Sequence, residues 1–294
     1  MDLIKFGLLG AIVAGGIALA LVWRRALGRT PPLPDVRAPR PAEVVVGFGT
    51  GFFDTLGIGS FAPTTALLKL FRMVPDELIP GTLNVGHAAS VILQSLIFIT
   101  SVEVAPALLA SMILAAAVGA WFGAGVVSRL PTRAIQLVMG VALLVAGSVF
   151  ACVNLGLLPG GGEALGLEGW RFWVANGASA VLGALMTAGI GMYAPTMIVL
   201  ALLGMHPLAA FPIMMGACAL LQSVAGVRFV ARGRFSSGAS LGLTLGDVPG
   251  VLIAAFAVRS LPLGYLRWLV VVVVAYAAFA MLRSVTARPA APRP

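Results

Sequence analysis

The chain has 294 residues, of which 60% are hydrophobic and only 10% are charged, and its mean hydropathy is +1.05. Soluble globular domains carry about 25% charged residues, so this composition excludes an ordinary soluble domain and predicts an all-α polytopic membrane protein in a lipid bilayer. The net charge of +9 comes from 19 Lys and Arg residues spread over short connections and the two ends, so no nucleic-acid partner is expected.

The two cysteines and two histidines are separated from one another along the chain. Cys152 and Cys218 both lie in apolar runs, without a second Cys or His at metal-ligand spacing. We therefore expect no disulfide framework, no metal site and no cofactor.

The first predicted element is an apolar transmembrane helix over residues 1–23. Lys5 precedes its apolar core, and three arginines follow it within residues 24–29. This arrangement favours an uncleaved anchor with its N-terminus outside over a cleaved signal peptide. The basic, Pro-rich segment 24–43 is then a cytoplasmic linker.

The rest of the chain holds eight further apolar runs, each long enough to span roughly 30 Å of hydrocarbon as a helix. They lie at about 44–71, 81–100, 105–127, 134–155, 172–203, 208–227, 238–258 and 264–282.

These runs form two copies of one unit. A shift of 132 positions superimposes "GIGSFAPTT" at Gly57–Thr65 on "GIGMYAPTM" at Gly189–Met197, and a shift of 131 aligns Gly119 with Gly250. The sequence therefore predicts repeat 1 at 44–155, a Gly-rich connection at 156–170, repeat 2 at 171–284 and a C-terminal tail at 285–294.

The relative orientation of the two repeats depends on the segments that hold the motif. Each segment is either one long crossing, which gives parallel repeats, or a re-entrant helical hairpin followed by three transmembrane helices, which gives inverted repeats. The hairpin arrangement places fifteen Lys and Arg residues in the cytoplasm and four outside, as the positive-inside rule favours. We therefore expect inverted repeats in a bacterial-type inner membrane, with the connection 156–170 outside and the C-terminus in the cytoplasm.

The repeated motif predicts an anion site near the midplane of the membrane. Its glycines allow backbone angles that side chains forbid, and its proline suits the first turn of a new helix. Two half-helix N-termini would then present N–H groups and partial positive charge to a bound anion; the alternative is a pair of simple helix kinks. The substrate-binding candidates in the motifs are Gly57, Gly59, Ser60, Pro63, Thr64, Thr65, Gly189, Gly191, Tyr193, Pro195 and Thr196.

Amide side chains in the neighbouring helices are further substrate-binding candidates. Asn84, His87 and Gln94 fall on one helix face, which we expect to look toward the hairpins. Gln222 is the comparable amide of the second repeat, although it lies about one turn out of step with the 132-residue shift.

Asp54, His87 and Asp247 are the candidates for carrying a coupled proton. Intramembrane ionisable residues are costly and are by default functional. The structural alternatives are a neutral Asp54 bonded to Thr50 or to nearby backbone, a His87 that is an ordinary bundle histidine, and an Asp247 that caps the kink at Pro249.

The doubled "GIG-x-[FY]-A-P-T" element, together with the "RLP" and "SLP" turns before the last helix of each half, resembles the TauE/SafE sulfite exporter family, also called the 4-toluene sulfonate uptake permease family. The resemblance covers about residues 44–284. It implies a secondary transporter of small sulfur-containing oxyanions, sulfite or organosulfonates, that usually exports them. The two halves differ at several polar positions, so the site need not be symmetric.

Other functions stay open at this point. A passive anion channel, a permease subunit or a carrier for another small organic anion would use the same features. A membrane-embedded enzyme would need a nucleophile with a base, a metal set or paired carboxylates at working spacing, and we expect no enzyme. No G-x-x-x-x-G-K-[ST] loop occurs in the sequence, so active transport would draw on a gradient. The apolar faces give no indication of an oligomeric state.

Overall fold

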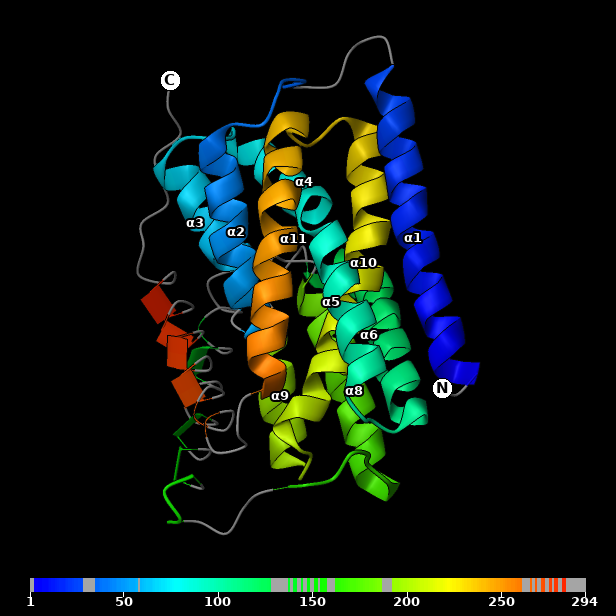
Figure 1. Ribbon diagram of the computed structural model, residues 1–294. Helices are drawn as coiled ribbons and strands as arrows, with labels where there is room; N and C mark the ends of the chain where they lie inside the picture. Colours follow the sequence, from blue (N-terminus) through cyan, green and yellow to red (C-terminus); the bar gives the residue numbers. More distant parts are fainter. Residues whose placement is uncertain are drawn as a thin grey trace.

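The computed structural model describes residues 3–28, 35–57, 59–127, 162–186 and 192–260, with scattered positions within 137–157 and 265–283. The elements described are helical (Figure 1). They are α1 (Leu3–Leu27), α2 (Pro41–Thr55), α3 (Phe61–Leu70), the short η1 (Asp76–Leu78), α4 (Ile79–Gly86), α5 (Ala88–Ser101), α6 (Pro106–Val127), α8 (Gly169–Met186), α9 (Tyr193–Leu202), the short η2 (Pro207–Ala209), α10 (Ala210–Arg232) and α11 (Ser237–Ser260).

Several of these helices have the length and composition of membrane spans. Among the described residues, four stretches are long and apolar enough to cross a bilayer, namely Leu3–Leu27, Ile79–Ser101, Pro207–Arg232 and Ser237–Phe256. Large apolar side chains such as Trp121 and Phe122 of α6 are exposed, as a lipid-facing surface requires. The prediction of an all-helical membrane protein is confirmed, and the first helix runs four residues beyond the expected boundary at residue 23.

The first copy of the repeated motif interrupts a helix, and a new helix begins within the second copy. α2 ends at Thr55 and α3 begins at Phe61, while α8 ends at Met186 and α9 begins at Tyr193. α3 and α9 have 10 residues each, so each is roughly 15 Å long, about half the hydrocarbon thickness. The first motif therefore ends one helix and starts another, as predicted, whereas residues 187–191 of the second break lie outside the described residues.

Glycine conformation explains the first of these breaks. Gly57 has φ +95° and Gly59 has φ +88°, a left-handed region that residues with a Cβ rarely enter. These two glycines turn the chain out of α2, and Pro63 follows in the first turn of α3.

α2 and α11 pack at backbone contact. A Cβ placed on Gly246 would lie 1.9 Å from the carbonyl oxygen of Val44, and a Cβ on Gly47 would lie 2.3 Å from the carbonyl oxygen of Leu243. Such distances are shorter than any van der Waals contact, so only glycine fits. Small residues allow this close approach between helices in a membrane.

α6 and α8 form a second pair of the same kind. A Cβ on Gly119 of α6 would lie 1.8 Å from a carbonyl oxygen of α8, and a Cβ on Gly183 of α8 would lie 2.1 Å from a carbonyl oxygen of α6. The repeat shifts match Gly119 with Gly250 and Gly183 with Gly51, which make the corresponding contacts between α11 and α2.

The linker before α2 is tied to the start of α11 by a group of charged residues. Glu43 is fully buried and accepts hydrogen bonds from the guanidinium of Arg37 and from the backbone N–H of Arg40. Arg37 also pairs with Asp35 at 2.7 Å, and Asp35 accepts a hydrogen bond from the Ser236 hydroxyl. We call Asp35, Arg37, Glu43 and Ser236 the linker clamp.

Removing the charge of Glu43 should destabilise the protein. Breaking a buried ion pair costs about 3–5 kcal/mol, and solvent screening of the partly exposed Arg37 lowers the expected loss for Glu43→Gln to about 2 kcal/mol. A thermal unfolding series in detergent checks this, with the exposed Glu77→Gln as the control. Equal Tm values for the two variants would contradict a stabilising clamp.

Candidate functional site

A group of buried polar side chains lies together where α2 ends and α4 passes into α5. The members come from both repeats and are at most 4% exposed. We call them the polar cluster: Asp54, Ser60, Thr64, His87, Ser90, Gln94, Tyr193 and Asp247.

Asp54 joins the two copies of the motif. Its carboxylate accepts a hydrogen bond from the backbone N–H of Ser60 at 2.5 Å and another from Nε2 of Gln94 at 2.9 Å. The hydroxyl of Tyr193, from the second motif, lies 3.5 Å from the same carboxylate. Thr50, the side-chain partner expected as an alternative, donates instead to carbonyls of its own helix. The Asp54 carboxyl thus lies at the N-terminus of α3 and is bonded to nearby backbone, which was the other structural alternative.

His87 connects the first repeat to α11. Its Nε2 lies 3.1 Å from the hydroxyl of Thr64, and its Nδ1 contacts the carboxylate of Asp247. The Ser90 hydroxyl lies 2.8 Å from the same carboxylate oxygen, to which it donates. Asp247 is therefore more than a cap for the kink at Pro249, which was the structural alternative.

The His87 contacts suit either protonation state of the ring. A neutral imidazole that donates from Nδ1 to Asp247 accepts the Thr64 hydroxyl proton at Nε2. A protonated imidazole donates to Asp247 and to Thr64 at the same time. The Thr64–His87–Asp247 chain can therefore gain or lose a proton without a change in its heavy-atom contacts.

The remaining sequence candidates fall into three groups. Pro63 and Pro195 occupy the third positions of α3 and α9, as predicted, and Thr65 is half-buried on α3. Asn84 does not join the polar cluster through a described hydrogen bond; it donates to the carbonyl of Pro80 at 2.8 Å, because that carbonyl lies one turn back on its own helix. Gly189 and Gly191 lie outside the described residues.

Thr196 and Gln222 are buried close to the second motif. Within the part of the chain that the structure describes, the Thr196 hydroxyl oxygen, Oε1 of Gln222 and Oδ1 of Asp247 have no hydrogen-bond partner. Gln222 follows Cys218 by one turn of α10, and the Cys218 sulfur lies 3.8 Å from the Met186 sulfur.

Sequence reasoning missed Ser90 and Cys218. Ser90 follows His87 by three residues, so helical spacing alone would have put it on the same face. Cys218 is buried on α10, which packs beside α9, and no spacing within α10 indicates that packing.

The polar cluster combines carboxylates, an imidazole, hydroxyls and helix N-termini in a water-poor setting. Such groups can hold a small anion and exchange protons with it. Among the described residues, no group of three or more His, Cys, Asp or Glu side chains is arranged to hold a metal ion.

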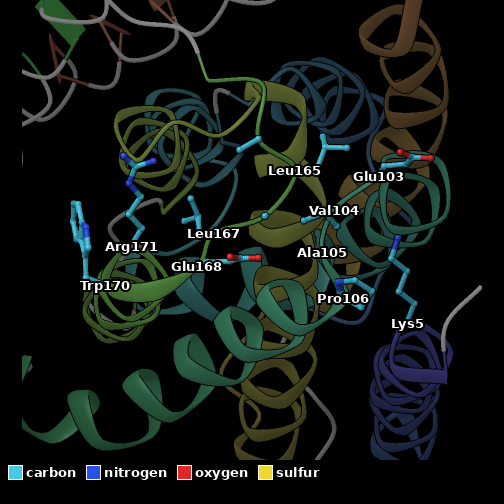
Figure 2. A pocket seen from close by; sticks show the side chains of 12 residues that line it. Lys5, Glu103, Val104, Ala105, Pro106, Leu165, Leu167, Glu168, Trp170 and Arg171 are labelled. Atoms are coloured by element: carbon cyan, nitrogen blue, oxygen red, sulfur yellow. The ribbon is translucent and has the colours of Figure 1, made fainter.

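A separate cavity of about 910 Å³ opens at the end of the bundle where α1 and α8 begin (Figure 2). Its charged lining side chains are Lys5, Glu103, Glu168 and Arg171, two of each sign. None of the polar cluster residues lines it. Positive and negative side chains are thus balanced around this cavity.

Comparison with known proteins adds one finding. The family model described as Sulfite exporter TauE/SafE matches residues 2–150, which is half of the chain and includes the first copy of the motif. No curated protein and no solved structure matches the chain.

Proposed function

Since the chain belongs to the sulfite exporter TauE/SafE family, we propose that it is a secondary transporter that exports a small sulfur-containing oxyanion, sulfite or an organosulfonate. The observation that carries this proposal is the meeting of the two motif copies at Asp54, with the Ser60 N–H and the Tyr193 hydroxyl on either side. The start of α3 and the Tyr193 hydroxyl of the second motif thus present hydrogen-bond donors to one buried carboxyl, and the same donors suit an anionic substrate.

The proposed architecture is a pair of inverted repeats, each a re-entrant hairpin plus three transmembrane helices. Two observations support it. The hairpin of α2 and α3 lies toward one end of the bundle, and that of α8 and α9 lies toward the opposite end (Figure 1). The α2–α11 and α6–α8 pairs also use glycines at matching repeat positions.

The proposed orientation puts the N-terminus outside and the linker in the cytoplasm of an inner membrane. The start of α1 and the start of α8 lie at one end of the bundle, and the linker clamp lies at the other (Figure 1). The arginine-rich turns at the clamp end support this orientation by the positive-inside rule.

A cysteine-labelling experiment tests the orientation and the hairpins together. In a background without Cys152 and Cys218, a cysteine at Pro131 should react with an impermeant maleimide only from the cytoplasmic side. A cysteine at Leu165 is the matched control and should react only from outside. Labelling of position 131 from outside would favour single crossings and parallel repeats instead.

In the proposed mechanism, Asp54 acts as a resident anion at the N-terminus of α3. While it is ionised, its carboxylate occupies the Ser60 N–H. Protonation of Asp54 weakens the hydrogen bond from the Ser60 N–H, which can then donate to the substrate anion. Binding of one proton therefore favours binding of one anion. His87 and Asp247 supply a second place for the coupled proton, and one half of the bundle then rocks against the other to release the anion.

A thermal-stability panel on the purified protein tests the substrate class. A ligand at 100 times its Kd stabilises the folded state by about 2.7 kcal/mol. We expect sulfite or one of the organosulfonates, such as taurine or sulfoacetate, to raise Tm, with sulfate and thiosulfate as competing oxyanions and acetate as the control. The absence of any shift with the sulfur compounds would contradict the proposal.

A further inference from the structure

The segment of residues 162–168, which lies directly before α8, pairs with the turn between α9 and η2. The Ala164 N–H donates to the carbonyl of Gly204 at 3.3 Å, and the Ala164 carbonyl accepts the N–H of His206 at 2.9 Å. A Cβ placed on Gly162 would lie 1.6 Å from the Gly204 carbonyl oxygen, so the two backbones are in direct contact. We call residues 162–168 the strap, and this pairing holds it to the second predicted repeat.

The strap is also joined to the first predicted repeat, at the connection between α5 and α6. The N–H of Ala105 donates to the Leu165 carbonyl at 2.8 Å (Figure 2). In the part of the chain that the structure describes, this is the one backbone hydrogen bond between the strap and that connection. A Cβ placed on Gly166 would lie 2.6 Å from the Ala105 Cβ. The strap therefore bridges the two halves of the chain at the end of the bundle where α1 and α8 begin.

The two attachments of the strap differ in strength. Two backbone hydrogen bonds link Ala164 to the second repeat, whereas Leu165 makes a single such bond to the first among the described residues. Ala164 and Leu165 are exposed, while Leu167 is buried in the main apolar core. Segments with few hydrogen bonds and little buried apolar surface open locally at the lowest free-energy cost. We therefore expect the bond between Ala105 and Leu165 to open first.

Rocking of the two halves requires one attachment to break. In the proposed mechanism the halves move against each other, so the α5–α6 connection moves relative to the α9–η2 turn. A strap bonded to both elements cannot follow both. Leu165 of the strap lines the same cavity as Val104 and Ala105 (Figure 2), so breaking the bond between Ala105 and Leu165 would widen that cavity.

We propose that the strap is a latch. It moves with the second repeat, and its bond to Ala105 is closed in this structure and opens each time the anion is released. This inference rests on the proposed transport function and adds the moving part at the end of the bundle where the anion leaves. A link that opens in every cycle must stay breakable, so a covalent bond in its place should stop transport.

A disulfide across this contact tests the latch. In a cysteine-free background, the pair Ala105→Cys and Gly166→Cys suits crosslinking. Disulfides hold two Cβ atoms about 3.5–4.5 Å apart, and a small backbone shift reaches that distance from 2.6 Å. The matched control is Ala164→Cys with Met205→Cys, because these residues pair between the strap and the second repeat. Mass spectrometry confirms each crosslink.

The readout is methanesulfonate flux into proteoliposomes, because sulfite itself cleaves disulfides. Oxidation of the 105–166 pair should lower the flux by at least about tenfold, and a reductant should restore it, since a closed latch blocks turnover. Oxidation of the 164–205 pair should change the flux by less than about twofold, since that link stays closed in the cycle. Unchanged flux in the oxidised 105–166 protein would overturn the inference, as would equal losses in the two oxidised pairs.

Hydrogen exchange on the unmodified protein is a second measurement, which needs neither the variants nor a transported ligand. After correction for intrinsic rates, the Ala105 amide should exchange at least about tenfold faster than the His206 amide, although both are bonded to the strap. Equal rates would contradict a strap that stays with the second repeat. This comparison decides the question if the 105–166 variant does not fold.

The two measurements separate this inference from the proposed function. If the cysteine-free parent carried neither sulfite nor any organosulfonate, the proposed function would fail. The exchange rates of Ala105 and His206 would still decide whether the strap opens at the first repeat.

Discussion

Replacing Asp54 with Asn should remove the pH dependence of transport. Asp54 accepts the Ser60 N–H and the Gln94 amide, and an asparagine of the same size keeps an acceptor oxygen but cannot exchange a proton. In the wild-type protein, binding of a sulfonate with fixed charge should strengthen as the pH falls, because protonation of Asp54 frees the start of α3. In Asp54→Asn this dependence should vanish, with anion affinity within about tenfold of the wild-type value.

The measurement is methanesulfonate flux into proteoliposomes over a pH series, with binding measured in parallel. Glu103→Gln is the control, because Glu103 is an exposed carboxylate at the outer cavity. If Asp54→Asn kept the wild-type pH dependence, the proton would have to be carried elsewhere, and the His87–Asp247 pair would be the next position to test.

Replacing Gly246 with Ala should strongly destabilise the protein. The new Cβ would lie 1.9 Å from the carbonyl oxygen of Val44 and 2.6 Å from the backbone nitrogen of Phe48, and backbone atoms cannot turn aside as a flexible side chain can. α2 and α11 must then separate, which also moves Asp247 away from His87. We expect a loss of about 3 kcal/mol or more, at the upper end for overpacking.

Gly49→Ala is the matched control for this test. Gly49 also lies on α2, but a Cβ there would meet no atom within 4 Å, and alanine favours a helix by about 1 kcal/mol over glycine in aqueous host peptides. The check compares Tm and the yield of monodisperse protein for the two variants. Similar stability for both would show that α2 and α11 are not packed at backbone contact.

The helix breaks could be predicted from the sequence because their causes are local. A left-handed glycine and a first-turn proline act within a few residues, and the first motif copy ends one helix and starts another as expected. The inward position of Gln94 could also be predicted, because helix spacing indicated which face of α5 looks toward the first motif. In the structure, Gln94 donates a hydrogen bond to Asp54.

The long-range contacts could not be predicted in this way. The contact between His87 and Asp247 joins residues 160 positions apart, and it exists because α11 packs against the α4–α5 junction, where a Cβ on Gly86 would lie 3.0 Å from the Leu243 side chain. Hydropathy records only that these helices are apolar. The linker clamp could not be predicted either. A basic, Pro-rich stretch predicts a solvated linker, whereas in the structure Arg37 forms an ion pair with the buried Glu43.

The location of the bound anion can be measured by anomalous diffraction from crystals grown with bromoethanesulfonate, whose bromine marks one ligand site. If the anion site is built from the two motifs, the bromine peak will lie between the start of α3 and the start of α9, beside Tyr193 and Thr196. A peak found only in the outer cavity near Arg171, with the polar cluster unchanged, would contradict a substrate site at the broken helices.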